Sequence, residues 1–348
     1  MVSLWLGGQS THCIMNKTNL LVNLPPGFFE TPVLKPVFGR LSRSADLRLR
    51  SHNTAEEIEA DLSWAEAVMM WSWPVWTEGL LDKAPRLRFA GHIDITQRGA
   101  KVALAHGLAV SVTRRGFSPA VAEMALGLIL STLRKTSTHH AAMRTGVEHW
   151  VQKFPDDIDP DERQLTGRAV GIVGFGAVGR RLAELLAPFG CPLSIHDPFL
   201  PEGVAQGFAA RRASLLELIE QSDVVVLCAA SNDGTRHLIG ASEIAAFRRS
   251  AVFVNVARAA LVDTAALIAR LQQGDMYAAL DVFDHEPLAP DAVLRRLPNV
   301  YLTPHRAGGI LESVERIMSG LADDLEAHLE NRPRSHALTE PMLPALDA

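Results

Sequence analysis

The sequence predicts an α/β protein in which two doubly wound parallel sheets are each wrapped by helices. Three observations predict this class. Short apolar runs alternate with helical segments from Asn19 onward, a pattern typical of parallel sheets. One apolar run turns through Gly174, Gly176 and Gly179 into an amphipathic helix. The 348 residues also suffice for two domains with substantial cores.

The composition is that of an ordinary globular protein, with 47% hydrophobic and 21% charged residues. The formal net charge of -5 leaves no electrostatic footprint for nucleic acid or an anionic membrane, so we expect neither as a partner. The three cysteines have no C-x-x-C spacing, which argues against a disulfide framework and a zinc site. We therefore expect no metal and a reducing, cytoplasmic location.

Two apolar segments resemble targeting or membrane elements only in part. The stretch 120–133 contains Glu123, and we expect it to be too short and too interrupted to span a bilayer. Residues 1–14 carry neither a basic region nor an apolar region long enough for a signal peptide. We interpret them as an extension before the first strand, upstream of a start at Met15.

The first half of the chain predicts a complete small α/β domain. Its strands are expected at 20–24, 47–51, 67–71, 87–91 and 109–113. The helix 54–62 begins with a threonine cap and an acidic first turn. A second helix, 96–106, is closed by Gly107.

A long helix from Pro119 to about Met143 is expected to connect the two domains. After an acidic loop, further strands are expected at 169–175, 192–197, 224–230, 252–256, 278–282 and 300–303. The last helix, 311–329, is amphipathic and is expected to return to the first domain. The predicted boundaries are therefore 15–116 plus 308–335 for a discontinuous substrate domain, and 117–307 for a dinucleotide-binding domain.

The glycine run predicts a dinucleotide site. Gly174 allows a tight turn, Gly176 lets a pyrophosphate approach the backbone, and Gly179 lets the helix pack on the sheet. The following strand ends in Asp197, 23 residues after Gly174, where such sites carry an acid. A plain strand-turn-helix is the alternative, and these combined contexts make it the weaker one.

Three polar side chains follow strands of the second domain. Arg258 follows 252–257, Glu286 follows 278–285, and His305 follows 300–304. Open α/β sheets bind ligands at this edge, so the three residues are candidates for chemistry. Taken singly, each also has a simpler interpretation: Arg258 as a solvated loop residue, Glu286 as a helix cap and His305 as a hydrogen-bonded packing residue.

Four strings together resemble the D-isomer-specific 2-hydroxyacid dehydrogenases: VGIVGFGAVGR at 170–180, NVARAALVD at 255–263, ALDVFDHEPL at 279–288 and LTPH at 302–305. The resemblance implies two Rossmann-like or flavodoxin-like domains with the active site in the cleft between them. It implies that Arg258 binds the substrate's carboxylate and carbonyl oxygen. It further implies that His305 is the acid/base, with Glu286 bonded to its other ring nitrogen, where a carboxylate favours the protonated imidazole.

The same resemblance implies the cofactor contacts. Asp197 accepts hydrogen bonds from the adenosine ribose and repels a 2′-phosphate, so NAD is expected rather than NADP. The remaining contacts implied are the backbone of the glycine loop with Ala177 and Val178, Val256 and Ala257 beside the nicotinamide, Asp281 at its carboxamide, and His305, Ala307 and Gly308 closing that end.

The chain departs from the family pattern where the substrate's carboxylate is usually held. The family's glycine-rich loop is replaced by 89–99, in which only Gly91 is kept of the glycines. His92, with Asp94 and Arg98, either reshapes the carboxylate site or forms a polar helix entry. Trp73, within the run 71–76 that holds three indoles, either walls the cleft and favours a bulky or apolar substrate, or belongs to a packing cluster.

Two smaller departures leave the catalytic groups in place. Ala259 stands where the family usually has glycine, and Cys228 stands where it often has histidine.

The sequence thus predicts an NAD-dependent oxidoreductase that reduces a 2-oxo acid to a D-2-hydroxy acid, or runs the reverse reaction. The alternative is an NAD(H)-sensing binding protein resembling the family's corepressors, and the altered loop 91–99 keeps it open. A third hypothesis retains the enzyme but replaces the acid with a non-carboxylate anion. By resemblance, the helix from Pro119 is expected to form a homodimer interface.

Overall fold

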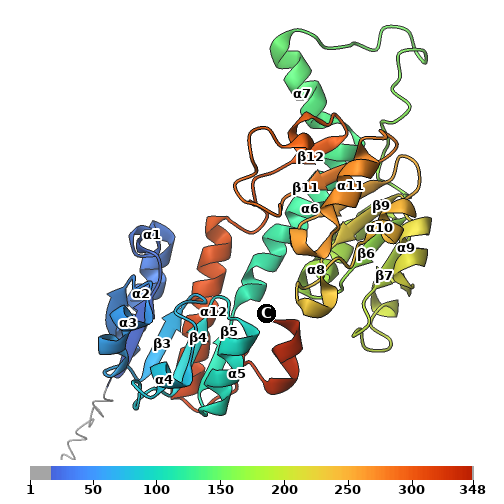
Figure 1. The fold of residues 1–348 in the computed structure, drawn as a ribbon. Helices are drawn as coiled ribbons and strands as arrows, with labels where there is room; N and C mark the ends of the chain where they lie inside the picture. Colours follow the sequence, from blue (N-terminus) through green and yellow to red (C-terminus); the bar gives the residue numbers. More distant parts are fainter. Residues whose placement is uncertain (1–16, 347–348) are drawn as a thin grey trace, which may run out of the picture.

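The computed structural model describes residues 17–346 and shows two lobes, each a parallel sheet with helices around it (Figure 1). The predicted α/β class with two parallel sheets is confirmed. The chain crosses between the lobes once after the first sheet and once again before the last long helix. The extension expected at 1–14 and the start expected at Met15 lie outside the described residues.

The first sheet has the order β2-β1-β3-β4-β5, and every neighbouring pair is parallel. Its strands are β1 Thr18–Asn23, β2 Ala45–Arg50, β3 Ala67–Met70, β4 Phe89–His92 and β5 Ala109–Val112, close to the expected ranges. Its helices are α1 Pro26–Glu30, α2 Lys35–Ser44, α3 Ala55–Leu62, α4 Glu78–Leu81 and α5 Gln97–Ala105. This is the flavodoxin-like strand order.

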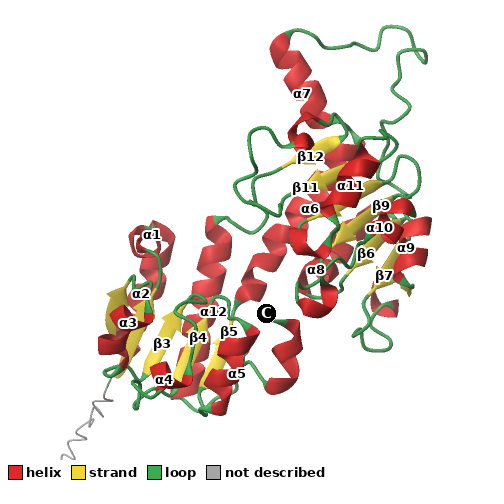
Figure 2. Cartoon of the chain, viewed as in Figure 1, coloured by secondary structure: helices red, strands yellow, loops and turns green. Residues whose placement is uncertain are grey.

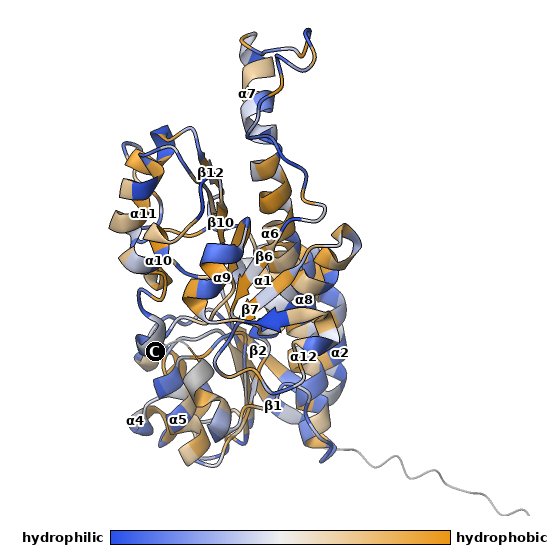
Figure 3. Ribbon diagram, turned by 90° about the vertical axis from the view of Figure 1, so that its right-hand side faces the viewer, coloured by the Kyte–Doolittle hydropathy of each residue, from blue (hydrophilic) through white to orange (hydrophobic). Residues whose placement is uncertain are grey.

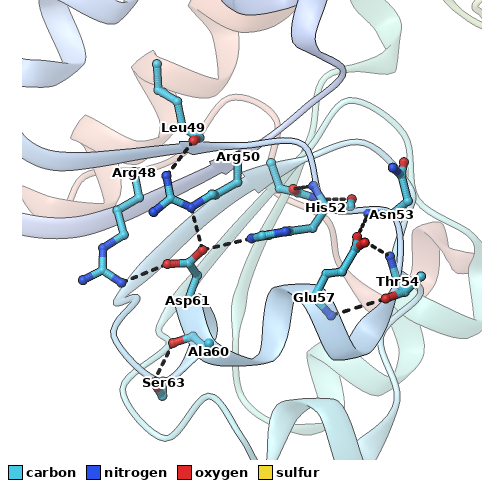
Figure 4. Close-up of polar contacts among 11 residues, drawn as sticks. Arg48, Leu49, Arg50, His52, Asn53, Thr54, Glu57, Ala60, Asp61 and Ser63 are labelled. Atoms are coloured by element: carbon cyan, nitrogen blue, oxygen red, sulfur yellow. Dashed lines mark hydrogen bonds and ion pairs between the residues drawn. The ribbon is translucent and has the colours of Figure 1, made fainter.

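Local signals set the helix starts in this lobe. Thr54 accepts a hydrogen bond from the backbone N–H of Glu57 at 3.3 Å, and the Glu57 carboxylate accepts one from the Thr54 N–H at 3.4 Å (Figure 4). This reciprocal capping box begins α3 where the sequence predicts it. The Thr96 hydroxyl caps α5 by accepting a single hydrogen bond from the Gly99 N–H at 3.1 Å, and Gly107 closes the end of α5 with a φ of 76°.

Asp61 ties α3 to the edge strand β2. Its carboxylate lies 2.9 Å from each of Arg48, Arg50 and His52 (Figure 4). Asp61 itself is only 8% exposed. Because three basic side chains of the β2 segment meet one carboxylate, this contact fixes the outer edge of the sheet.

The predicted long connector helix is wrong as a single element. The structure has α6 Ser118–Leu133 and α7 Thr136–Thr145, separated at Lys135, whose φ of 47° is left-handed. The apolar positions that hold α6 in the core end at Leu133. Beyond them the Lys135 ammonium binds Asp159 at 2.6 Å, so α7 leaves the lobe and, with the loop after it, projects as an arm (Figure 2).

The segment Arg114–Leu133 spans 20 residues and is long and apolar enough to cross a membrane by length and composition alone. The expectation that it is too short is therefore corrected. In the structure its buried side chains, including Ala122, Ala125 and Ile129, pack in the core of the second lobe against residues of β6 and α8. Figure 3 shows how apolar α6 is, and this fits a helix with one side in the core.

The second sheet has the order β12-β11-β10-β9-β6-β7-β8, parallel throughout. Its strands are β6 Val170–Val173, β7 Leu193–His196, β8 Ala210–Arg212, β9 Val224–Leu227, β10 Val252–Asn255, β11 Tyr277–Leu280 and β12 Val300–Leu302. Its helices include α8 Ala177–Leu186, α9 Leu215–Gln221, α10 Ala241–Ala245 and α11 Thr264–Leu271. The strand β8 was not predicted, because this short, exposed edge strand carries two arginines and no apolar run.

The last helix, α12 Leu311–Leu329, packs on the first sheet. Its buried residues Ile317, Leu321 and Leu325 share a core with Leu20 and Phe89. The chain therefore returns to the first lobe, although the exact domain boundaries stay a prediction. Both crossings join the first sheet at the carboxyl ends of its strands, so this edge faces the second lobe (Figure 1).

Candidate active site

The three glycines of the 174–179 loop occupy three different environments. Gly174 has a φ of 88°, and a Cβ there would lie 2.5 Å from the backbone of Ala229. A Cβ on Gly179 would lie 2.4 Å from the carbonyl oxygen of Gly174. A Cβ on Gly176 would have no protein atom within 4 Å. The first and third glycines thus serve the fold, whereas Gly176 leaves open space at the start of α8, the place predicted for the pyrophosphate.

Asp197 lies at the end of β7, beside the glycine loop. Its carboxylate accepts hydrogen bonds from the backbone N–H of Phe175 at 2.8 Å and of Phe199 at 2.9 Å. Arg212, at the end of β8, donates to the carbonyl oxygen of Asp197 at 3.4 Å. Sequence reasoning missed this arginine because it missed β8, and a positive charge therefore lies near the predicted ribose site.

Arg258 leaves the carboxyl end of β10 on a turn shaped by Asn255. The Asn255 side chain accepts from the Ala257 N–H at 3.0 Å and donates to the Arg258 carbonyl at 3.1 Å. Asn255 is buried, which a sequence motif alone does not reveal. The exposed Arg258 side chain donates to the Ala257 carbonyl oxygen at 2.8 Å.

His305 and Glu286 form a direct pair. Nδ1 of His305 lies 2.7 Å from Oε2 of Glu286, whose other oxygen accepts from the Phe283 N–H at 3.0 Å. Partial burial raises the pKa of Glu286, but the hydrogen bonds from His305 and Phe283 outweigh it and hold that pKa below 4.5. Glu286 is therefore ionised at neutral pH.

Asp281 organises the backbone that carries His305. It is fully buried, and its carboxylate accepts from the Thr303 hydroxyl at 2.6 Å and from the N–H groups of Arg306 and Ala307, both at 2.9 Å. His305 has a left-handed φ of 51°, which is uncommon for a residue other than glycine and occurs often at functional sites. Both carboxylate oxygens of Asp281 accept hydrogen bonds from the segment around His305, so Asp281 positions that segment. The expected contact of Asp281 with the nicotinamide carboxamide stays a prediction.

The three candidate catalytic residues line one pocket of about 280 Å³. Its walls are formed by Arg258, Ala259, Val282, Phe283, Asp284, Glu286 and His305. A larger hollow of about 670 Å³ lies at the amino edge of the first sheet, among Lys17, Glu66 and Arg86. Open α/β sheets bind ligands at the carboxyl edge, so the smaller pocket is the candidate site.

Gly91 and His92 are both buried in the structure. Gly91 is a buried residue of β4, where a Cβ would lie 3.0 Å from the Phe89 ring. His92 is 1% exposed, and both of its ring nitrogens are engaged by protein groups. The expected contacts of these two residues with substrate stay predictions. Thr96 caps α5 just beyond them, which fits the helix-entry interpretation of this segment.

The other predicted cofactor residues surround the same strand ends. Ala177 and Val178 form the first turn of α8, and Val256 and Ala257 lie between β10 and Arg258. Ala307 is buried, and a Cβ on Gly308 would lie 3.1 Å from Phe117 of the first crossing. These positions bring the two crossings together beside His305.

Cys228, which is partly buried, stands where the family often has histidine. Burial raises the pKa of its thiol to about 12, so it takes no part in proton transfer at neutral pH. Among the described residues 17–346, no group of three or more His, Cys, Asp or Glu side chains is arranged to hold a metal.

Comparison with known proteins identifies the relatives of this chain. Residues 126–307 match the NAD binding domain of the D-isomer specific 2-hydroxyacid dehydrogenases. A glyoxylate reductase from Aeropyrum pernix is 33% identical over 259 residues, covering 73% of this chain and 76% of that enzyme. A solved protein from Pyrococcus horikoshii OT3 has a TM-score of 0.79 at 25% identity, covering 94% of this chain and 97% of that chain.

A further solved relative is a glyoxylate/hydroxypyruvate reductase from Sinorhizobium meliloti, described as NADPH-dependent and in complex with NADP and malonate. It has a TM-score of 0.73 at 27% identity and covers 93% of this chain and 97% of that chain.

The fold and the matched domain define a nicotinamide-dinucleotide-dependent oxidoreductase. The chain belongs to the D-isomer specific 2-hydroxyacid dehydrogenase family. It is a 2-hydroxyacid dehydrogenase, and this prediction is confirmed over the alternative of a binding protein that senses NAD(H).

Proposed function

We propose that the enzyme reduces a small 2-oxo acid to its D-2-hydroxy acid, or oxidises it in reverse, in the pocket of Arg258, Glu286 and His305. One observation carries this assignment of residues. The three side chains follow the neighbouring strands β10, β11 and β12 and line a single pocket. A cation, an acid/base and the carboxylate that supports it are the groups that this reaction requires.

Arg258 is assigned to the substrate's carboxylate and carbonyl oxygen. Its planar guanidinium matches a carboxylate and stays charged at any working pH. Negative charge grows on the carbonyl oxygen during reduction, and a cation fixed nearby stabilises that charge. A bound reduced nicotinamide supplies the hydride.

His305 is assigned as the acid in reduction and the base in oxidation. Its contact through Nδ1 with Glu286 leaves Nε2 for the substrate oxygen. The ionised Glu286 fixes the ring's orientation and favours the protonated ring that must donate. Asp281 supports this geometry by accepting hydrogen bonds from the backbone N–H groups that follow His305.

The cofactor assignments follow the open space at Gly176. The backbone at Ala177 and Val178 would hold the pyrophosphate, and Asp197 would accept the ribose hydroxyls. Val256, Ala257, Ala307 and Gly308 would enclose the nicotinamide end. We infer a preference for NAD over NADP from the Asp197 carboxylate, which would repel a 2′-phosphate. The positive charge of Arg212 would weaken this preference without reversing it.

The two lobes would bind different molecules, one the cofactor and the other the substrate. We assign 117–307 to cofactor binding and 15–116 plus 308–335 to substrate binding. The packing of α12 on the first sheet supports this division.

The projecting arm supports a homodimer. Large apolar side chains are exposed along it, among them Val147 at 64%, Trp150 at 64% and Phe154 at 81%. Exposed apolar surface of this kind marks protein contacts, and α6 leads directly into the arm. We propose that a second copy of the chain covers it. Light scattering should then give twice the chain mass, and a Trp150→Ser, Phe154→Ser double variant should give the monomer.

We further propose that the enzyme works in the cytoplasm on small 2-oxo or 2-hydroxy acids, without nucleic acid or membrane partners. The free thiols of Cys191 and Cys228 fit a reducing compartment.

The test is NADH oxidation with glyoxylate, hydroxypyruvate and phenylpyruvate. We expect turnover of at least one of them, and His305→Gln should reduce its kcat by about 100- to 10,000-fold. The matched control is Glu220→Gln, an exposed substitution on α9. NADH binding without turnover of any 2-oxo acid would overturn the proposed function.

A further inference from the structure

Three aromatic side chains gather at the carboxyl edge of the first sheet. Trp71 and Trp73 stack with ring centroids 5.6 Å apart and an angle of 28° between the rings. Phe28 meets Trp71 edge-on at 5.8 Å and 89°. All three are partly exposed, so the group, here called the aromatic wall, presents apolar ring surface instead of being sealed in the core.

The aromatic wall lies where this fold places ligands. Phe28 belongs to α1, directly after β1, and the two tryptophans directly follow β3. In the order β2-β1-β3-β4-β5, the chain leaves β1 toward one edge of the sheet and continues from β3 toward the other. The crevice outside such a switch point, at the carboxyl ends of the strands, is the general ligand site of open α/β sheets.

This edge also faces the second lobe. Arg316 near the start of α12 donates to the carbonyl oxygen of Gly116 at 2.6 Å, so the two crossings are joined at this end of the sheet. In Figure 1, α1 and the start of α12 lie at the same end of the first lobe, toward the second. The aromatic wall and the pocket of Arg258 and His305 therefore belong to facing edges of the two sheets.

His92 holds the loop that carries the tryptophans at both ends. Its Nδ1 lies 2.7 Å from the carbonyl oxygen of Trp71, and its Nε2 accepts a hydrogen bond from the indole N–H of Trp76 at 2.8 Å. These two contacts fix the tautomer, with the proton on Nδ1. Burial lowers the pKa of His92 to about 4, so the imidazole stays neutral at working pH and the arrangement does not titrate.

We propose that the aromatic wall selects 2-oxo acids with a planar aromatic side chain, and that His92 is the positioning residue that keeps Trp71 and Trp73 in place. The inference rests on the proposed function, because Arg258 and His305 must engage the 2-oxo acid end. The side chain at C3 then extends toward the first lobe. Stacked and edge-on ring contacts add to simple burial for an aromatic group, whereas glyoxylate has no side chain to use them.

The first test needs no variant. The wild-type kcat/KM for phenylpyruvate should exceed that for glyoxylate by about tenfold or more, since a buried apolar group of this size is worth at least that factor. Phenyllactate should likewise inhibit more strongly than lactate. An equal or greater kcat/KM for glyoxylate would overturn the aromatic preference and leave the proposed function standing. No turnover of any 2-oxo acid would overturn both.

Substitution of Trp73 tests the wall itself. Trp73→Ala should lower the phenylpyruvate kcat/KM by about 10- to 100-fold and the glyoxylate value by less than about threefold. The matched control is Trp64→Ala, because Trp64 precedes β3 at the opposite edge of the same sheet and contacts Arg48 there. Equal losses for both substrates in Trp73→Ala would contradict the proposal.

Substitution of His92 tests its positioning role. In His92→Asn the side-chain amide can still donate to the Trp71 carbonyl, but the acceptor for Trp76 is lost. We expect the KM for phenylpyruvate to rise about tenfold with kcat nearly unchanged, and both constants for glyoxylate to be retained. A parallel fall of kcat for both acids would indicate general damage to the lobe and would refute the assigned role.

Discussion

The carboxylate of Glu286 lies 2.7 Å from Nδ1 of His305, although the two residues come from segments that follow different strands, β11 and β12. Neither side chain is deeply buried. The pair is held by its backbone supports, since Glu286 accepts from the Phe283 N–H and the His305 N–H donates to the Asp281 carbonyl oxygen at 2.8 Å. The proton transfer proposed for this site would thus depend on the relative position of these two neighbouring loops.

Glu286→Gln should change the pH profile of the reaction. The amide removes the negative charge beside the imidazole, so the rate of reduction should begin to fall at a lower pH than in wild type. At pH 7 the kcat/KM should drop by about 10- to 100-fold. Initial rates from pH 5 to 10 measure both effects. An unaltered profile would contradict the role of Glu286, and Glu220→Gln serves as the exposed control.

Asp281→Asn should reduce kcat more than cofactor affinity. An asparagine amide cannot accept all the hydrogen bonds from Thr303, Arg306 and Ala307, so the backbone around His305 loses its support. We expect kcat to fall about 10- to 100-fold with little change in the KM for NADH. Steady-state kinetics with both substrates varied separates the two. A rise in that KM at constant kcat would instead show a direct carboxamide contact.

Gly176→Ala and Gly179→Ala should have opposite consequences. The Cβ at Gly176 meets no protein atom within 4 Å, so the fold and its Tm should be unchanged while NADH affinity falls about tenfold or more. The Cβ at Gly179 would lie 2.4 Å from a backbone oxygen, so that variant should lose stability. Thermal melts and fluorescence titration with NADH distinguish the cases. A lowered Tm in Gly176→Ala would remove the argument that its space belongs to a ligand.

The charges at Asp197 and Arg212 predict a cofactor preference. The wild-type kcat/KM for NADH should exceed that for NADPH by about tenfold or more, because a carboxylate repels the 2′-phosphate. Asp197→Ser should narrow this ratio, and Arg212→Ala should widen it. Comparable use of both cofactors by the wild type would contradict the preference assigned to Asp197 and would indicate that Arg212 offsets its charge.

Asp61→Asn should lower the stability of the first lobe without touching the active site. Burial raises the pKa of Asp61, but hydrogen bonds from His52, Arg48 and Arg50 outweigh it and hold that pKa below 3.8. The carboxylate therefore stabilises the fold above that value and loses this contribution as the pH falls through its folded pKa. We expect a loss of about 1–3 kcal/mol at pH 7 that shrinks below pH 4. Urea unfolding at both pH values measures it, and Asp323→Asn, at an exposed ion pair on α12, is the control.

The sequence predicts those parts of the fold that depend on local patterns. Parallel strands are buried on both faces and appear as apolar runs, and Thr54 and Thr96 cap helices through their own backbone neighbourhoods. The short edge strand β8 lacks such a run, and at the break Lys135 contacts Asp159, which lies 24 residues further along the chain. Both features therefore escape prediction.

Some residues of the candidate site can likewise be predicted from local sequence patterns, and others cannot. Glycine spacing and strand ends point to Gly176, Arg258, Glu286 and His305 because the fold brings all carboxyl ends to one edge. His92 has the same signal, a histidine at a strand end, yet its partner is the indole of Trp76, and only tertiary packing reveals this. Asn255 and Arg212 were missed because their contacts are made through turn geometry and through an unpredicted strand.

The second crossing has a mechanical consequence. His305 stands at the beginning of this segment and Leu311 opens α12 at its end, so only a few residues separate the proposed proton donor from the first lobe. Any rotation of one lobe about the other must be absorbed by torsions in this short piece and in the partner segment around Gly116. Closure of the two lobes would therefore also reorient the imidazole of His305. Enclosing the acid and positioning the proposed proton donor would then occur in one movement.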